Sequence, residues 1–376
     1  MTHTRSRPTT TQQAPDRAAP ATQPSGRRRG SLAGAWLVLG LAALVVSVVV
    51  AMRIGPASVS TAEILASGYH HLMQGLSAAG LPVAETTNPL SPSRDAIIWQ
   101  GRAPRLITAA CVGAGLALCG VVMQGLTRNP LADPYLLGVS SGAALGAVAV
   151  LLLGVAIWLP VAAFAGALIA LGLTLALAGF GGRLTPSRTI LAGIAVAQAC
   201  SALVSFAIFA TARGDSYREI LGWLLGSLAR ASWSSVLISA IALVTVGAVV
   251  LGAGRSLDAF AFGDVSATSL GVDVTRTRWV LLTLTAVLTG AMVAVSGAIG
   301  FVGLVIPHIV RLALTSRHRW LLPLSGTVGA VFLLWADTAA RVVFAPMEVP
   351  VGVFTAGIGA PVFAWLLLRQ RAGGLR

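Results

Sequence analysis

Long runs of apolar residues, separated by short polar segments, repeat along almost the whole chain. Most runs hold about 20 residues, which lets a helix cross the ~30 Å hydrocarbon core of a bilayer. The pattern predicts ten spanning helices, near residues 31–52, 104–124, 135–154, 158–180, 189–210, 233–253, 279–296, 299–314, 321–343 and 351–369. The expected fold class is an all-α polytopic membrane protein.

Two segments fall outside this pattern. Residues 1–30 consist largely of Thr, Gln, Pro, Ser and Arg and offer almost nothing to bury, so they predict a disordered cytoplasmic tail before one membrane domain, 31–376. Residues 53–100 are more polar and carry turn signals, which places them outside the membrane. The adjacent His70 and His71 in this segment are expected to be solvated rather than to contact a ligand.

Glycine and proline interrupt the apolar pattern at two places. One is "RNPLADPYLLGVSSGA" (128–143), in which Pro130 and Pro134 forbid an uninterrupted helix. The other is "SGAIGFVGLVIP" (296–307). The spans that precede these stretches are predicted to cross in opposite directions. Interrupted segments at corresponding places in oppositely oriented halves are typical of transporters with inverted repeats.

The fifth and tenth predicted spans each carry a stripe of small residues at every fourth position. Such stripes let helix backbones approach closely in lipid. The pattern alone leaves open whether they pack within one subunit, form a subunit interface or line a pathway for a solute. The residues are Gly193, Ala197, Ser201 and Ser205, and Gly352, Ala356, Ala360 and Ala364.

Composition agrees with a membrane protein. Only 10% of residues are charged, 56% are hydrophobic and the mean hydropathy is +0.84, so a 376-residue soluble protein could not cover its surface. All 26 basic residues are arginine. The absence of lysine excludes a P-loop and Schiff-base chemistry, so any ATP must be bound by another chain.

The arginines also predict the orientation in the membrane. On the ten-span scheme 18 of them lie on one side and eight on the other. Because positive charge is enriched in cytoplasmic loops, the N- and C-termini are both expected in the cytoplasm. This topology explains the net charge of +14 better than nucleic-acid binding does.

The remaining reactive residues indicate no catalytic or metal centre. Cys111, Cys119 and Cys200 fall inside predicted spans and are expected to be packing residues. Asp337 is the one carboxylate clearly within a span, where structural pairing, for example with Arg341 at i+4, is favoured over proton coupling. An intramembrane enzyme would need a catalytic cluster that is missing here. An ion-coupled secondary transporter remains as an alternative.

Several stretches resemble the permease subunits of FecCD-like (type II) ABC importers for ferric siderophores, haem and vitamin B12. They include "RAPRLITAACVGAGLALCGVVMQGLTRNPLADPYLLGVSSGA" (102–143), "ILAGIAVAQACSAL" (190–203), "SGAIGFVGLVIPHIVRL" (296–312) and "ADTAARVVFAPMEVPVGVFTAGIGAPVFAWLLL" (336–368). The resemblance covers about residues 32–370 in consistent order.

The resemblance implies a type II importer permease with ten helices in the bacterial inner membrane. It also implies a second permease subunit, expected to be another copy of this chain, and an extracytoplasmic binding protein. Two cytoplasmic ATPase subunits would bind ATP and Mg, with no cofactor and no catalysis on this chain. The expected substrate is a ferric siderophore, with haem or cobalamin as alternatives.

Functional positions follow from the same resemblance. Arg102, Arg105 and Arg341 are expected to dock the binding protein, since guanidinium groups bind carboxylates bidentately. Interfacial anchoring is the alternative. Two inner loops are expected to form cytoplasmic gates, with plain turns as the alternative; they contribute Asn129 and Leu131, and Thr185, Pro186 and Ser187, where Pro186 departs from the family pattern.

The longest inner loop, 257–278, resembles the segment that couples such permeases to their ATPases. The residues expected to take part are Leu257, Phe260, Gly263, Asp264, Ser266, Leu270 and Gly271. The resemblance also favours the small-residue stripes of the fifth and tenth spans as a translocation path or dimer face.

Overall fold

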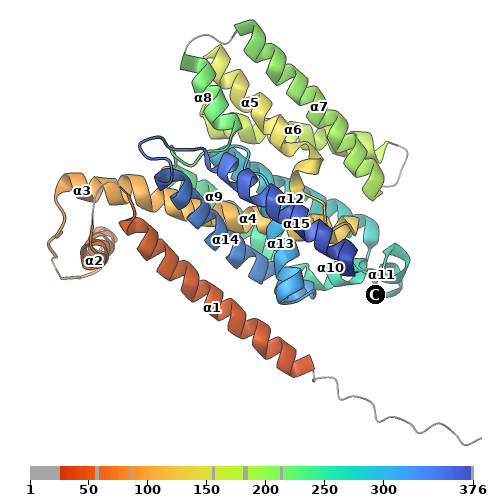
Figure 1. Cartoon of the computed structure of the whole chain (residues 1–376), viewed down its shortest axis with the longest axis horizontal. Coiled ribbons are helices and arrows are strands. Elements are labelled where there is room, and N and C mark those ends of the chain that lie inside the picture. Colours follow the sequence, from red (N-terminus) through yellow and green to blue (C-terminus); the bar gives the residue numbers. More distant parts are fainter. Residues whose placement is uncertain are drawn as a thin grey trace, which may run out of the picture.

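The computed structural model describes residues 26–55, 59–84, 86–154, 157–180, 185–211 and 215–373. Within these residues the regular structure is helical and contains no strand (Figure 1). The all-α prediction is therefore confirmed for the described part of the chain.

Each of the ten predicted spans corresponds to a helix. Seven helical segments are long and apolar enough to cross a membrane, and the apolar parts of three others are shorter. The ten helices are α1 (Gly26–Arg53), α4 (Ala103–Thr127), α5 (Val139–Leu153), α6 (Leu159–Gly179), α7 (Pro186–Thr211), α9 (Trp233–Gly252), α12 (Val274–Ser296), α13 (Val302–Ala313), α14 (His318–Val342) and α15 (Val351–Gly373).

Shorter helices fill the connections. At one end of the bundle lie α2 (Thr61–Ala78), α3 (Pro92–Ala96), the π-helical turn η1 (Ile97–Arg102) and α8 (Asp215–Leu224) (Figure 1). We call this the arginine end, because Arg102, Arg105 and Arg341 lie there. At the other end lie α10 (Gly254–Phe260) and α11 (Asp264–Ser269), and the 3₁₀ turn η2 (Pro134–Leu137) precedes α5.

The first helix is longer than the sequence predicts. α1 begins at Gly26, inside the segment expected to be a tail up to residue 30. Arginine is among the better helix formers, so the triplet at 27–29 extends the helix of the apolar run instead of ending it. Residues 1–25 lie outside the described residues, and the tail remains a prediction there.

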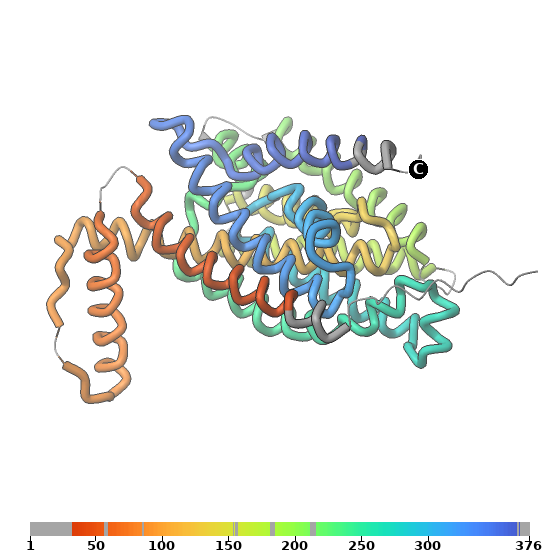
Figure 2. Tube along the Cα trace, turned by 60° about the horizontal axis from the view of Figure 1, so that its bottom comes forward, coloured from red at the N-terminus to blue at the C-terminus, as the bar shows by residue number. Residues whose placement is uncertain are grey.

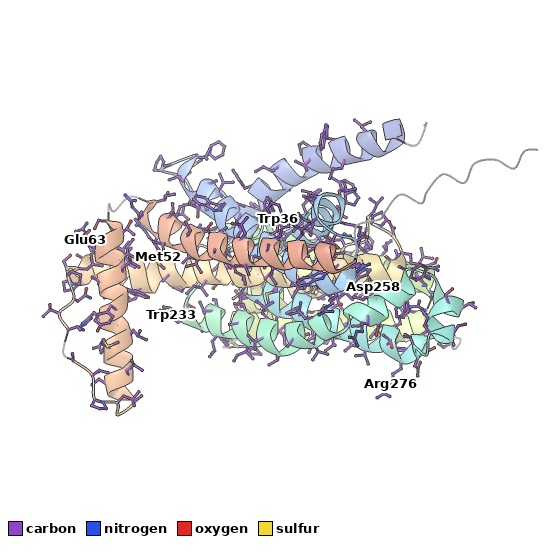
Figure 3. The ribbon with its side chains drawn as sticks, turned by 90° about the horizontal axis from the view of Figure 1, so that it is seen from below. Trp36, Met52, Glu63, Trp233, Asp258 and Arg276 are labelled. Carbon is purple, nitrogen blue, oxygen red and sulfur yellow. The ribbon has the colours of Figure 1, made fainter. Side chains whose placement is uncertain are left out.

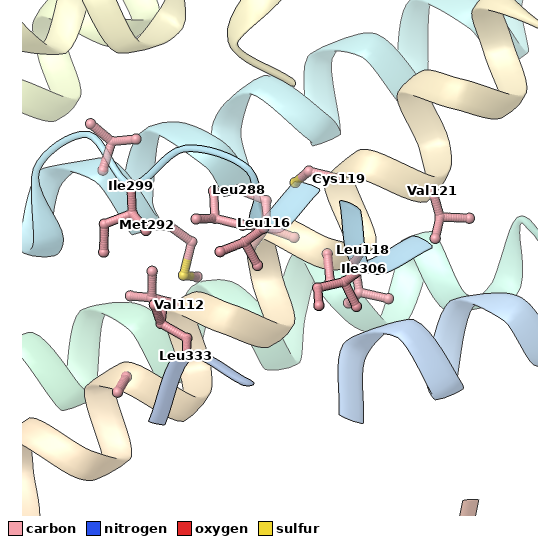
Figure 4. Close-up of a cluster of buried hydrophobic side chains, with 14 of the residues drawn as sticks. Val112, Leu116, Leu118, Cys119, Val121, Leu288, Met292, Ile299, Ile306 and Leu333 are labelled. Atoms are coloured by element: carbon pink, nitrogen blue, oxygen red, sulfur yellow. The ribbon is translucent and has the colours of Figure 1, made fainter. Parts of the chain in front are cut away.

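α4 forms the centre of the bundle and is buried along nearly its whole length. It packs against α14, α9, α12 and α13, and its apolar side chains meet theirs in the core (Figure 4). Backbones approach closely at two glycines. A Cβ at Gly113 would lie 2.2 Å from the carbonyl oxygen of Gly329, and one at Gly120 would lie 1.9 Å from that of Gly303. Close packing of this kind holds helices together in lipid.

α5, α6, α7 and α8 form a group beside this centre, in the upper part of Figure 1. α5 and α6 cross at glycines, where a Cβ on Gly142 would lie 2.5 Å from the carbonyl oxygen of Gly166. α7 packs on α5, α6 and η2, and α15 packs on α13 and α14. Much of the surface of α7 and α15 therefore stays uncovered in a single chain.

α2 runs across the direction of the bundle helices, as Figures 2 and 3 show. It begins with a capping box in which the backbone N–H of Glu63 donates to Ser60 Oγ and that of Ser60 donates to the Glu63 carboxylate. The hydrogen bond from the Ser60 N–H stabilises the ionised carboxylate and lowers the pKa of Glu63. The beginning of α2 lies beside the end of α1.

Candidate functional site

The three arginines expected to dock a binding protein lie together at the arginine end. Arg102 Nη1 donates to the carbonyl of Met52 at 2.7 Å, and Arg341 Nη2 donates to that of Ile54 at 3.0 Å. The two guanidinium groups thus bind carbonyls at and just beyond the end of α1, where a helix leaves carbonyl groups without an N–H partner. Arg102 is only 4% exposed, although η1 places it at the surface end of the longest helical segment.

Arg105 makes the strongest contacts of the three. Its Nε and Nη2 donate to the two carboxylate oxygens of Asp337 at 2.8 and 3.0 Å, and its Nη1 donates to Glu348 at 2.8 Å. A bidentate guanidinium–carboxylate pair of this kind is strong and directional. The structural pairing of Asp337 is confirmed, but its partner is Arg105 on α4 and not Arg341 one turn away.

Arg102 and Arg105 are both buried, and Arg341 is the one of the three that is partly accessible. Arg105 is 8% exposed and is held by two carboxylates of its own chain, so its geometry favours a role in joining α4 to α14. Arg341 is half-buried. The docking role of all three remains a prediction.

The small-residue stripes of α7 and α15 each have two parts. At one end of each stripe a glycine packs on backbone: a Cβ would lie 1.8 Å from the Leu136 carbonyl oxygen at Gly193, and 2.1 Å from that of Leu225 at Gly352. Farther along, Ser201, Ser205, Ala360 and Ala364 are exposed, and Ala197 and Ala356 are half-buried. The stripes therefore combine internal packing with a free surface.

A groove of about 400 Å³ opens beside the α7 stripe. Asp133, Tyr135 and Phe301 line it together with Gly193 and Gln198 of α7. Phe301 has a left-handed backbone with φ of 68°, and its ring side lies so close to α15 that a Cβ on Gly359 would be 2.5 Å away. Strained residues of this type concentrate where function constrains the backbone.

The two interrupted stretches meet at this groove. The hydroxyl of Tyr135, in η2, donates to the carbonyl of Ile299 at 2.8 Å and accepts from its N–H at 3.0 Å. Gln124 Nε2 adds a bond to the Leu304 carbonyl at 3.1 Å. The structure thus joins the segments that sequence analysis singled out, while their relation as an inverted repeat remains a prediction.

Asp133 caps η2 through a 2.8 Å hydrogen bond from the Tyr135 N–H. Burial raises the pKa of the Asp133 carboxyl from 3.8 to about 6, because desolvation disfavours the charged form. The groove is therefore lined by a carboxyl whose proton is held more tightly than that of a solvated aspartate.

The two expected gates are compact turns next to helix ends. Arg128 ends α4 in a left-handed conformation, and the side chain of Asn129 accepts from the Leu131 N–H at 2.9 Å. Leu131 is 42% exposed. At the other loop Pro186 is the first residue of α7, a favourable place for proline, and Thr185 and Ser187 are exposed. Their gating role remains a prediction.

The loop 257–278 forms two short helices, α10 and α11, as the resemblance implies. Leu257 and Phe260 are buried, so they anchor the loop and offer no surface to a partner. Arg278 fixes it further through a 2.9 Å bond to Asp264 and a 5.3 Å approach to the Phe260 ring. Asp258 accepts from the His318 N–H at 2.9 Å and ties α10 to α14.

The exposed face of this loop includes some of the residues that the sequence predicted for coupling and others that it did not. Phe262, Val265 and Leu270 are 75, 83 and 66% exposed. Ser266 and Gly271 are also exposed, whereas Gly263 is buried and turns the chain with φ of +94°. Phe262 was missed, because no pattern in the sequence distinguishes it from the buried Phe260 two residues earlier.

Comparison with known proteins now identifies the family. The model of the FecCD transport family matches residues 41–369. The hemin transport system permease protein HmuU of Yersinia pestis is 44% identical over 281 residues, covering 73% of this chain and 84% of that protein. The vitamin B12 import system permease protein BtuC of Klebsiella pneumoniae is 43% identical over 287 residues, covering 76% and 86%.

A solved structure agrees with these relatives. An ABC transporter described as of the metal-chelate type, in an inward-facing conformation, is similar with a TM-score of 0.75 and 32% identity. The similarity covers 89% of this chain and 98% of that one. The chain therefore belongs to the FecCD transport family and is a permease of an ABC importer.

Proposed function

We propose that this chain moves a large metal chelate across the bacterial inner membrane by alternating access, driven by ATP bound on other subunits. A ferric siderophore is the first candidate substrate. Haem and vitamin B12 are the alternatives, and the names of the relatives support them. The structural neighbour supports the wider class of metal chelates.

The orientation proposed places the α10–α11 end in the cytoplasm, together with both termini. Arg255, Arg276 and Arg319 lie on or next to α10, α11 and the start of α14, which supports this choice. Figure 3 shows Asp258 and Arg276 at the end opposite to Glu63. The arginine end then faces the binding protein, and Arg341 is the first candidate for its carboxylates, because it is half-buried whereas Arg102 and Arg105 are 4 and 8% exposed.

The main support for this proposal is the exposed apolar face of the α10–α11 unit. Phe262, Val265 and Leu270 project from a unit that buried residues and an ion pair hold firmly to the bundle. These three side chains form a rigid apolar cluster, here called the apolar knob, of the kind that binds in a groove of a partner protein. Two ATPase subunits with ATP and Mg are the proposed partners, and a second copy of this chain is proposed to pack against α7 and α15.

Transport by a reconstituted complex tests this function. The chain, its ATPase and its binding protein are placed in proteoliposomes, and uptake of labelled ferric siderophore, haem and vitamin B12 is measured with and without ATP. We expect ATP-dependent uptake of one chelate. Accumulation by the chain alone, driven by an ion gradient, would contradict the proposal and favour the secondary transporter.

A further inference from the structure

α2 carries an apolar stripe that no part of the described chain covers. Leu65, Tyr69 and Leu72 are 58, 54 and 58% exposed. With the half-buried Leu76 they fall within about 60° of one another, at the ~100° turn per residue of an α-helix. A helix outside the membrane-spanning segments does not usually present four large apolar residues to water, so this stripe calls for a partner.

The other two faces of α2 are occupied by the chain itself. On one face the Ser67 hydroxyl donates to Asp95 at 2.8 Å, and His71 Nε2 lies 3.0 Å from the same carboxylate. On the next face His70 Nδ1 lies 2.9 Å from Thr86 Oγ1. The histidine pair is thus hydrogen-bonded within the chain, which corrects the expectation that it is simply solvated.

These contacts fix the direction of the apolar stripe. Residues 79–84 and 86–91 lie along the side of α2 that faces away from the bundle (Figure 2). His70 and Ser77 border that segment, and they lie roughly 120° around the helix from the middle of the stripe. The stripe therefore lies on the flank of α2 nearer the level of the membrane-spanning helices.

The position of α2 matches the surface of a membrane. It lies across the bundle axis at the arginine end, and its far end projects beyond α9 (Figures 2 and 3). Trp233, at the first residue of α9, is 47% exposed and donates to the Trp99 carbonyl at 2.7 Å. Exposed tryptophans at helix ends typically mark the interface between headgroups and acyl chains.

Positive charge lies at the same level. A groove of about 590 Å³ between the end of α1 and the start of α2 is lined by Arg53 and Arg94 together with Glu63 and Ser60. Arg94 pairs with Glu63 at 3.2 Å, whereas Arg53 is exposed. An apolar stripe beside an arginine is the combination found in helices that lie in a membrane interface.

We propose that α2 lies on the membrane surface at the arginine end, with Leu65, Tyr69, Leu72 and Leu76 at the boundary of headgroups and acyl chains and Arg53 beside lipid phosphates. The exposed apolar surface of α1, a helix long enough to span a membrane, ends beside the start of α2, which supports phospholipid over a protein as the occupant. The choice of leaflet rests on the proposed function: in the orientation given there, α2 lies on the outer leaflet.

Photo-crosslinking identifies the occupant directly. Benzoylphenylalanine replaces Leu72 or, as a control, Ser77, in the full chain in vesicles of phosphatidylethanolamine and phosphatidylglycerol with its ATPase and binding protein. Both positions are exposed, so the fold tolerates the change. We expect a phospholipid adduct at position 72 and none at 77. An adduct of position 72 to the binding protein or to a second copy overturns the proposal, as does equal labelling by lipid at both positions.

Spin labels give a second measurement that does not depend on crosslinking chemistry. Leu72→Cys and Ser77→Cys are labelled in a chain whose Cys111, Cys119 and Cys200 are replaced by alanine. The ratio of collisions with oxygen to collisions with a water-soluble nickel chelate should be several-fold higher at position 72. Equal ratios overturn the proposal. If position 72 contacts lipid but Ser77→Cys reacts with an impermeant thiol reagent only from the ATP side, α2 does lie on the membrane and the proposed orientation is wrong.

Discussion

Asp337 illustrates what a single residue decides in this fold. Its charge lies within a membrane-spanning helix, where an unpaired carboxylate is very unfavourable. The two parallel hydrogen bonds from Arg105 compensate for this burial and connect α4 to α14. Sequence analysis predicted that Asp337 is paired, but the partner lies 232 positions away, and only packing of α4 against α14 brings the two together.

Removing this carboxylate should destabilise the chain strongly. Asp337→Asn removes the charge that balances the buried Arg105 guanidinium and replaces one of its three acceptor oxygens with an amide NH₂, and breaking a buried pair typically removes about 3–5 kcal/mol. Glu348→Gln is the matched control, since Glu348 is 45% exposed and such a pair contributes about 1 kcal/mol or less. Thermal unfolding in detergent, followed by gel filtration, measures both. Equal effects of the two changes would show that burial of the pair does not matter.

Asp133 predicts a pH dependence of stability. Because its pKa is raised from 3.8 to about 6 in the folded chain, the folded state holds the proton more tightly than the unfolded state. Folding is therefore favoured below this window, and stability falls as the pH rises from 3.8 to about 6. Asp133→Asn keeps the cap on η2 and removes the charge. Its melting temperature should exceed that of the wild type at pH 8 and equal it at pH 4. The same difference in melting temperature at both pH values would show that the pKa of Asp133 is not raised on folding.

At the scale of elements, the seven described helices that are long and apolar enough to span a membrane follow from apolar run length, because lipid requires every backbone group to be paired within the helix. The short helices were predicted less completely. α2 was read as a polar external segment, although Ser60 and Glu63 carry the sequence signature of a capping box. In α10 and α11 the pattern could not separate Leu257 and Phe260, which are buried, from Phe262 and Val265, which are exposed, because the difference arises from packing on α4 and α14.

The α10–α11 unit yields a prediction about coupling. Phe262→Ser combined with Val265→Ser removes the exposed apolar knob and leaves the buried anchors untouched. We expect the binding protein to lose its stimulation of ATP hydrolysis, since the ATPase no longer seats on the knob. Thr268→Ala, an exposed polar position of the same α11, should retain it. Full stimulation in the double variant would place the ATPase contact elsewhere.

At the scale of the whole molecule, α7 and α15 are incompletely covered, as α1 and α9 also are, and they lie on either side of η2 and the 297–301 turn. In lipid, exposed small residues on such helices favour contact with another helix. The sequence identified both stripes but could not show which of their residues pack within the chain and which stay exposed. Only the structure shows that Gly193 and Gly352 are consumed by internal packing, whereas Ser201 and Ala360 remain available.

A crosslinking experiment tests the proposed pairing of two chains. In a chain otherwise without cysteine, Ser201→Cys should yield a covalent dimer with a bismaleimide in membranes, because the free part of the α7 stripe faces the second copy. Leu203→Cys, exposed on another face of the same helix, should stay monomeric. Dimer formation at position 203 but not at 201 would reverse the face assigned to the interface.

The double hydrogen bond between Tyr135 and the backbone of Ile299 has a consequence for how a passage can widen. It joins η2 and the turn at Ile299 into one unit, so separating them within this chain would leave a phenol and an amide without hydrogen-bond partners. If a second copy packs against α7 and α15, as proposed, a passage between the two chains can widen without breaking these bonds. The transport path would then lie between the two copies rather than inside either of them.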